Sequence, residues 1–297
     1  MDWDNLRFFL EVARAGRLTT AARRLGVDHT TVSRRLQALE KSMGLQLFLR
    51  EPGGYMLTEA GRGLLPRVEA MESASAAIEH ALPNPGDKLS GQVRIGATEG
   101  YGALMLAGQL AALGERYPHL SIDLLALPRA VRLSRHEADI VITLERPERG
   151  PFIITRLTDY VLRLYASREY LARHAPIRRQ EDLAAHRFVS YVDDLLFSKE
   201  LLFLEGLADP QAVGLRSTSV LAQQEAVAAG AGIAILPAFA ADRDARLQVL
   251  LPDEVRFTRT FWMLMPIEFK DLARMRTTWD YLKATAEQAR ATMMGEP

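Results

Sequence analysis

Polar side chains with the chemistry to hydrogen-bond to nucleotide bases recur within a short stretch after Asp28. At 100° per residue, the apolar positions Val32, Leu36 and Leu39 fall on one side of a helix. The opposite side then carries imidazole, hydroxyl, guanidinium and amide groups, on His29, Thr30, Ser33, Arg34 and Gln37. Arginine can pair bidentately with guanine, and hydroxyl and amide groups can meet other base edges. An ordinary solvated helix face has the same pattern, so both interpretations stay open on spacing alone.

Catalytic and metal-binding patterns are missing from the sequence. The six histidines form no pair four residues apart and no HExxH motif, so a zinc enzyme is not expected. No serine lies within G-x-S-x-G, no phosphate-binding G-x-x-x-x-G-K-[ST] occurs, and there is no cysteine. Gly230 and Gly232 begin a G-x-G pattern, but Ile235 stands where the third glycine should be, which favours a simple helix-to-strand turn. We therefore expect no catalytic residue, no metal and no cofactor.

Three short helices are predicted to position the polar face. Apolar residues spaced three and four apart run up to Gly16, and a second, shorter run ends at Gly26. Asp28 can then cap a third helix, which Gly44 closes. Two short helices joined to a third through a glycine-containing turn predict a helix-turn-helix.

A hairpin and an excess of positive charge accompany these helices. Residues 48–50 and 55–57 are predicted strands around the turn Glu51–Gly54, which makes a candidate wing. Residues 17–50 carry seven basic and two acidic side chains, whereas the whole chain has 37 of each and no net charge. A basic head on a mildly acidic body is typical of a nucleic-acid-binding module attached to another domain.

A long helix is predicted to follow, from Glu59 to about residue 80, with Thr58 as its cap and a kink at Pro66. Its apolar residues have a spacing close to a heptad, at Leu64, Val68, Met71, Ile78 and Leu82. We interpret this seam as a dimer contact, because a small head offers little core for so long a helix. Packing against the same chain is the alternative. The linker Pro83–Lys88 then marks a domain boundary near residue 88.

Beyond the linker, strands and helices alternate. Strands are expected at 93–97, 122–127, 140–143, 161–166, 188–191 and 233–236, with helices after Thr98 to about 115 and at 168–174, 220–229 and 272–288. This alternation predicts an α/β architecture with largely parallel sheets. About 200 residues suffice for two lobes with a ligand cleft between them. The absence of a signal peptide and of any apolar run long enough to span a bilayer predicts a cytoplasmic protein.

Motifs along the chain resemble those of LysR-type transcriptional regulators. The N-terminal set is AARRLGV at 21–27, TVSRRL at 31–36, LE at 39–40, GLQLFLR at 44–50 and LTEAG at 57–61. Weaker matches follow in the family's order, with LSGQVRIG at 89–96, RYP at 116–118, EADI at 137–140 and AGAGIAILP at 229–237. The N-terminal set is highly specific, and the motifs together cover nearly the whole chain.

The resemblance implies a domain organisation. It comprises a winged helix-turn-helix at 1–58, a linker and dimerisation helix at 59–82, a hinge at 83–91 and an effector-binding domain at 92–297. The last domain is expected to be a periplasmic-binding-protein-like α/β domain, with lobe I at about 92–160 and 262–297 and lobe II at about 161–261. Two residues depart from the family's pattern. Arg17 replaces a hydroxyl helix cap, and His29 occupies a base-facing position where the family often has glutamine.

Two sets of site residues follow from this organisation. The predicted DNA-binding set is His29, Thr30, Thr31, Ser33, Arg34, Arg35, Gln37 and Arg50, with Arg50 on the wing. Two predicted helix starts offer a hydroxyl and free backbone N–H groups to a small polar ligand. In the family these loops face each other, which implies an effector site at Thr98, Glu99, Tyr101, Arg129, Phe203, Ser217 and Thr218. A weakly acidic or polar metabolite is expected there, unless the hydroxyls only cap helices.

These features predict a sequence-specific DNA-binding transcriptional regulator, not an enzyme, modulated by a small-molecule effector bound between two α/β lobes. Expected partners are double-stranded DNA, the effector, further copies in a dimer or tetramer, and RNA polymerase; no membrane association is expected. The alternative is an α/β ligand-binding or enzymatic protein whose basic N-terminal head docks a protein partner. A docking head, however, has no need of a capped helix with a base-contacting face followed by a hairpin wing.

Overall fold

The computed structural model describes residues 3–51, 54–65, 67–68, 71–72, 89–129, 137–147, 150–202, 207 and 212–296. The contacts divide the chain into two units, Met1–Pro85 and Gly86–Pro297. Each unit has its own hydrophobic core. None of the helices in the described ranges is both long and apolar enough to cross a membrane.

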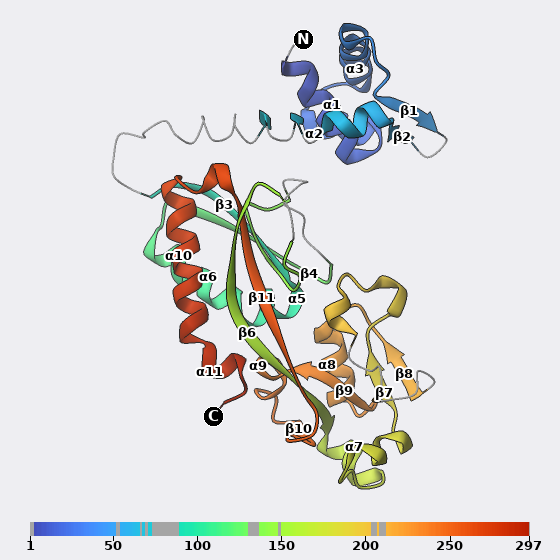
Figure 1. Cartoon of the computed structure of the whole chain (residues 1–297), viewed down its shortest axis with the longest axis vertical. Coiled ribbons are helices and arrows are strands. Elements are labelled where there is room, and N and C mark those ends of the chain that lie inside the picture. Colours follow the sequence, from blue (N-terminus) through green and yellow to red (C-terminus); the bar gives the residue numbers. More distant parts are fainter. Residues whose placement is uncertain are drawn as a thin grey trace. The chain divides into compact units, whose positions relative to one another are not determined.

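The N-terminal unit contains the predicted helices and hairpin (Figure 1). They are α1 (Trp3–Ala15), α2 (Leu18–Leu25), α3 (His29–Met43), β1 (Phe48–Glu51) and β2 (Gly54–Leu57). Gly26 and Gly44 end α2 and α3 with φ of 67° and 64°, a left-handed conformation that residues with a β-carbon rarely adopt. The side chain of Asp28 caps α3, whereas α2 starts after Arg17 without a side-chain cap.

The hairpin is fixed to the core of this unit at several points. The ring centroid of Phe48 lies 5.3 Å from that of Phe9 on α1, and both rings are buried. The Tyr55 N–H donates to the Gly16 carbonyl at 2.8 Å, which ties β2 to the turn between α1 and α2. On the other side, the Glu40 carboxylate of α3 accepts hydrogen bonds from two backbone N–H groups at the start of the hairpin. The position of the wing relative to α3 is therefore well determined by contacts.

The long helix begins by packing against the same core. The Thr58 hydroxyl accepts from the Gly61 N–H at 3.0 Å and caps it, and residues 59–65 are helical. Val68 is 1% exposed within the core of the unit, whereas Met71 is 44% exposed. The prediction that Val68 contacts a partner subunit is therefore wrong, because its own chain already covers it. Pro66, Ile78 and Leu82 lie outside the described residues.

A mixed sheet organises the C-terminal unit (Figure 1). In the described residues its strand order is β4-β3-β5-β11-β6-β9-β7-β8, and β10 pairs with β6. The strands are β3 (Gly91–Thr98), β4 (Leu120–Leu127), β5 (Ile140–Thr143), β6 (Phe152–Ser167), β7 (Phe188–Ser190), β8 (Val213–Arg216), β9 (Ile233–Pro237), β10 (Leu247–Leu250) and β11 (Arg256–Pro266). Strand β3 runs parallel to β4 and β5, and β7 runs parallel to β8 and β9.

The expectation of largely parallel sheets is corrected by two long strands that join the two parallel groups. Strand β6 pairs antiparallel with β11, and the register of this pair shifts between Phe261 and Trp262. Strand β11 also pairs antiparallel with β5, and β6 with β9, so the ribbon connects both groups. The predicted strand at 161–166 is the second half of β6. The ranges of β8 and β10 are not among the predicted strands.

Helices pack on both parallel groups. One helical run consists of α5 (Glu99–Tyr101), a π-helical turn (Gly102–Leu106) and α6 (Ala107–Arg116), and α10 (Ala273–Gln288) lies beside it. The Tyr281 hydroxyl of α10 donates to the Gln109 carbonyl of α6 at 2.7 Å. The remaining helices are α7 (Arg168–Arg173), α8 (Val220–Ala228), α9 (Ala238–Ala241) and α11 (Arg290–Met293). The last strand and helix thus lie with β3 and β5, as the resemblance implies.

Candidate functional site

Helix α3 presents a polar face to solvent. Val32, Leu36 and Leu39 are at most 4% exposed in the core of the N-terminal unit, so the opposite side of the helix faces away from the protein. Of the predicted DNA-binding residues on α3, four are exposed and three are half-buried: His29, Thr30, Arg34 and Gln37 in the first group, and Thr31, Ser33 and Arg35 in the second. The structure thus brings these seven side chains onto one helix.

The start of α3 is held by a polar cap. The Asp28 carboxylate accepts hydrogen bonds from the Thr30 N–H at 2.8 Å and from the Thr30 hydroxyl at 2.7 Å. These hydrogen bonds, led by that of the Thr30 hydroxyl, lower the pKa of Asp28. Because the Thr30 hydroxyl proton already donates within the cap, its oxygen is left to accept from a ligand rather than to donate.

Two neighbouring arginines on α3 differ in their surroundings. Arg34 is exposed and makes no hydrogen bond or ion pair within the described part of the chain. Arg35 instead donates to the Asn5 side chain at 3.3 Å, and its guanidinium lies 5.8 Å from the centroid of the Phe8 ring. Arg35 belongs to the predicted DNA-binding set, but in the structure its side chain is directed to α1. Arg50 is exposed on β1 of the wing, paired in register with Tyr55.

A cleft in the C-terminal unit lies between the end of β3 and the start of α8. It encloses about 430 Å³ between its atoms, including space open to solvent. Its lining is largely aromatic and aliphatic: Thr98, Glu99, Gly100, Tyr101, Pro128, Leu144, Tyr160, Leu162, Tyr191, Phe197, Leu201, Thr218, Val220, Pro237, Phe239 and Phe261. Ligand sites of proteins have the same character, with a few polar groups in an apolar cavity.

Four of the predicted effector residues line this cleft, namely Thr98, Glu99, Tyr101 and Thr218. Ser217 does not line it, and its hydroxyl accepts from the Ser219 N–H in a local turn. Arg129 does not line it either, since its guanidinium pairs with Glu137 at 2.9 Å. Phe203 lies outside the described residues. The predicted capping role of Thr98 is wrong, because its side chain makes no cap hydrogen bond.

Glu99 is the charged residue of the cleft lining. One of its carboxylate oxygens, Oε1, accepts from the Ser219 hydroxyl of the α8 cap at 2.9 Å. The other oxygen, Oε2, is buried and has no hydrogen-bond partner in the described structure. Burial, with a further contribution from the nearby Glu99 carboxylate, raises the pKa of Tyr191 above the usual tyrosine range. The Glu99 carboxylate and the Tyr191 phenol both line this cleft.

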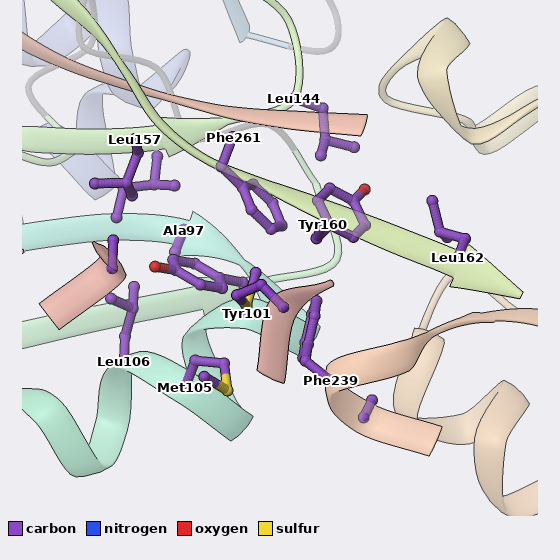
Figure 2. Packing of buried hydrophobic residues seen from close by; sticks show 14 of the residues in the cluster. Ala97, Tyr101, Met105, Leu106, Leu144, Leu157, Tyr160, Leu162, Phe239 and Phe261 are labelled. Carbon is purple, nitrogen blue, oxygen red and sulfur yellow. The ribbon is translucent and has the colours of Figure 1, made fainter. Parts of the chain in front are cut away.

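A stack of aromatic rings forms one wall of the cleft (Figure 2). The ring of Phe261 lies between Tyr101 and Tyr160, with centroid distances of 4.5 and 4.4 Å, and Phe239 contacts both tyrosines edge-on. Apart from Tyr101, sequence reasoning missed these rings as site residues. They come from β6, β11 and α9, so no spacing within one element could signal them; only the topology brings them together.

Comparisons with known proteins agree with this two-unit arrangement. The model of the LysR substrate binding domain matches residues 86–287, and that of the bacterial regulatory helix-turn-helix protein, lysR family, matches residues 3–62. A protein that combines these units is a DNA-binding transcriptional regulator with an effector-binding domain. This chain belongs to the LysR family of such regulators.

Individual relatives span nearly the whole chain. The Mau operon transcriptional activator of Paracoccus denitrificans is 32% identical over 288 residues, which cover 94% of this chain and 95% of that protein. The transcriptional regulator CrgA of Neisseria meningitidis is 25% identical over 84% of each chain. The solved structures of ArgP from Mycobacterium tuberculosis (TM-score 0.70, 19% identity, 96% and 97% of the two chains) and of the virulence activator AphB from Vibrio cholerae (TM-score 0.62, 22% identity, 96% and 99%) share the fold.

Proposed function

We propose that α3 enters the major groove of DNA and that Arg34, Gln37 and His29 contact base edges. The observation that carries this proposal is the contrast between the two sides of α3. One side is buried in the core of the N-terminal unit. The other side is exposed and carries side chains such as Arg34, which makes no hydrogen bond or ion pair within the described residues. Ser33 and Thr31 lie beside them as further hydroxyl groups, and Arg50 on the wing is positioned to contact the phosphate backbone or the minor groove.

The aromatic cleft is the proposed effector site, with Thr98, Glu99, Tyr101 and Thr218 as contacts. Its support is the mostly apolar lining with few polar groups. We assign about 92–160 and 262–297 to one lobe and about 161–261 to the other. An effector that changes the closure of these lobes would alter the spacing of the DNA-binding heads in an oligomer. Since the polar groups of Ser217 and Arg129 are engaged elsewhere, neither is needed in this proposal.

Assembly and cellular context complete the proposal. We propose a cytoplasmic homodimer, or a tetramer built from it, that acts on RNA polymerase and catalyses no reaction. The linker helix supports the dimer through its exposed Met71, and Ile78 and Leu82 continue the heptad spacing, whereas Leu64 packs partly against the core of its own unit. Paired heads would require a two-fold symmetric operator.

In vitro selection from a random duplex pool tests the proposed function. The full-length chain should enrich a pseudo-palindrome whose half-sites lie one helical turn apart or a multiple of it. In gel shifts at fixed salt, the enriched operator should bind ~10³-fold or more tightly than random DNA. A chain that enriches no sequence and binds all duplexes equally would refute sequence-specific recognition and favour the protein-docking alternative.

A further inference from the structure

The Glu99 carboxylate is an unusual group to find at the edge of an aromatic cleft. Its Oε1 is satisfied by the Ser219 hydroxyl, but its Oε2 is buried without a partner among the described residues. Burying a carboxylate oxygen away from water without giving it a hydrogen-bond donor costs free energy. Glu99 lies in the first turn of the helical run, where the helix dipole favours an acidic residue. That position explains the carboxylate but does not explain why its Oε2 atom is buried.

No cationic side chain lines this cleft in the described part of the chain. The lining residues include one carboxylate, hydroxyl groups and apolar side chains, but neither lysine nor arginine. Arg259 interacts electrostatically with Tyr160, but its guanidinium is paired with the Glu200 carboxylate at 2.6 Å. The charge in the cleft is therefore negative, which disfavours the anionic effector that the helix start alone would suggest.

The aromatic rings that line the cleft together with Glu99 add a second preference for a cation. Tyr191 and Phe197 line the cleft and are not engaged in a ring contact in the described structure, in contrast to the stacked rings of Tyr101, Phe261 and Tyr160. Aromatic faces attract ammonium groups, and they do so most strongly where water is excluded. An ammonium group at this position could donate to Glu99 Oε2 and lie against an aromatic wall at once.

We propose that the effector is a small organic ammonium ion whose charged group pairs with Glu99 and whose apolar part lies among the aromatic residues. This inference rests on the proposed function of the cleft as the effector site. The cleft encloses about 430 Å³, including space open to solvent, which suits a small ligand.

The test uses three probes of nearly equal size and different charge. They are n-propylammonium chloride, 1-propanol and sodium propionate, each titrated into the full-length chain by calorimetry at matched ionic strength. The variants are wild type, Glu99→Gln and Glu115→Gln. Glutamine at position 99 keeps an oxygen that accepts from Ser219 but removes the charge, whereas Glu115 is an exposed residue of the same helical run that controls for charge loss elsewhere.

We expect n-propylammonium to bind the wild type more tightly than propanol, and propionate to bind least. Glu99→Gln should weaken ammonium binding at least tenfold and change propanol binding by less than twofold, while Glu115→Gln should leave both unchanged. The melting temperature of unliganded Glu99→Gln should equal or exceed that of the wild type, because an unpartnered buried charge is removed. Tighter binding of propionate, equal ammonium affinity in Glu99→Gln, or no ammonium binding at all would overturn the proposal.

Gel shifts on the selected operator separate this inference from the proposed function. If operator binding is specific but n-propylammonium chloride gives no more binding signal than a sodium chloride control, the ammonium proposal alone fails. If ammonium binds through Glu99 and operator binding does not respond to it, the ligand class stands and the regulatory role of the cleft fails.

Discussion

The adjacent residues Arg34 and Arg35 allow a sharp test of how α3 functions. Replacing each with alanine removes one positive charge from the same helix turn, but the two side chains make different contacts in the structure. Arg34 has no protein partner in the described residues, so Arg34→Ala should leave the free energy of unfolding unchanged. Arg35 holds the buried Asn5 and lies over Phe8, so Arg35→Ala should destabilise the head.

The expected magnitudes follow from these contacts. A bidentate arginine–guanine pair contributes ~1–3 kcal/mol of discrimination, which corresponds to a roughly 5- to 150-fold loss on the operator for Arg34→Ala. For Arg35→Ala, a long hydrogen bond and a partly exposed cation–π contact together predict a loss of ~1–2 kcal/mol in unfolding. Its loss in DNA affinity should be smaller and similar for operator and random DNA.

Three measurements check this reasoning: gel shifts on operator and on single-base variants, the salt dependence of binding, and urea unfolding. Arg34→Ala should relax discrimination at one base pair and keep the wild-type salt slope. Arg50→Ala, as the matched backbone contact, should weaken binding to all sequences and reduce the salt slope by about 1. Equal losses for Arg34→Ala on operator and random DNA would refute a base contact, and an unchanged unfolding free energy for Arg35→Ala would refute its assignment to the core.

Further predictions concern the wing, the linker helix and the C-terminal unit. An alanine β-carbon at Gly54, where φ is 139°, would lie 2.2 Å from a carbonyl oxygen of the turn that holds the wing, so Gly54→Ala should weaken binding to all DNA sequences in gel shifts. Val68→Ala should cost ~1–3 kcal/mol of head stability in urea unfolding, whereas Met71→Ala should leave that stability unchanged and promote dissociation in sedimentation. Hydrogen bonds from Arg246 lower the pKa of Asp244 to about 2, so about 1–2 kcal/mol of stability should be present above about pH 4 and lost as the pH falls towards 2. Asp244→Asn should abolish that pH dependence in unfolding titrations.

The sequence predicted the head well because local signals determine it. Asp28 and Gly44 fix where α3 begins and ends, Gly26 ends α2, and apolar periodicity identifies the buried side of α3. Partners of individual polar side chains were harder to predict. The helical wheel places Arg34 and Arg35 close together, and only the packing of α1 against α3 shows that Arg35 is directed to Asn5.

The cleft could be predicted only in part. Thr98, Glu99 and Thr218 were accessible to sequence reasoning because they lie where a strand is followed by a helix. The aromatic wall was not, because its rings come from distant segments that meet only through the β6–β11 ribbon. Polar residues near helix starts therefore suggested a polar effector, whereas the surrounding rings, which dominate the lining, favour an apolar body.

The same ribbon connects the cleft to the architecture of the domain. Tyr160 and Phe261 lie on β6 and β11, next to the register shift where these strands pass between the parallel groups. Gly100 lets the start of the helical run approach α8 closely, since a β-carbon there would lie 2.7 Å from the Val220 side chain. A ligand in the proposed site would thus contact both groups and the ribbon between them. A ligand shifts an equilibrium between two conformations of the protein only by the difference in its affinity for them. Glu99 Oε2 has no hydrogen-bond partner among the described residues, so a ligand that donates to it in one conformation only would create a large difference in affinity.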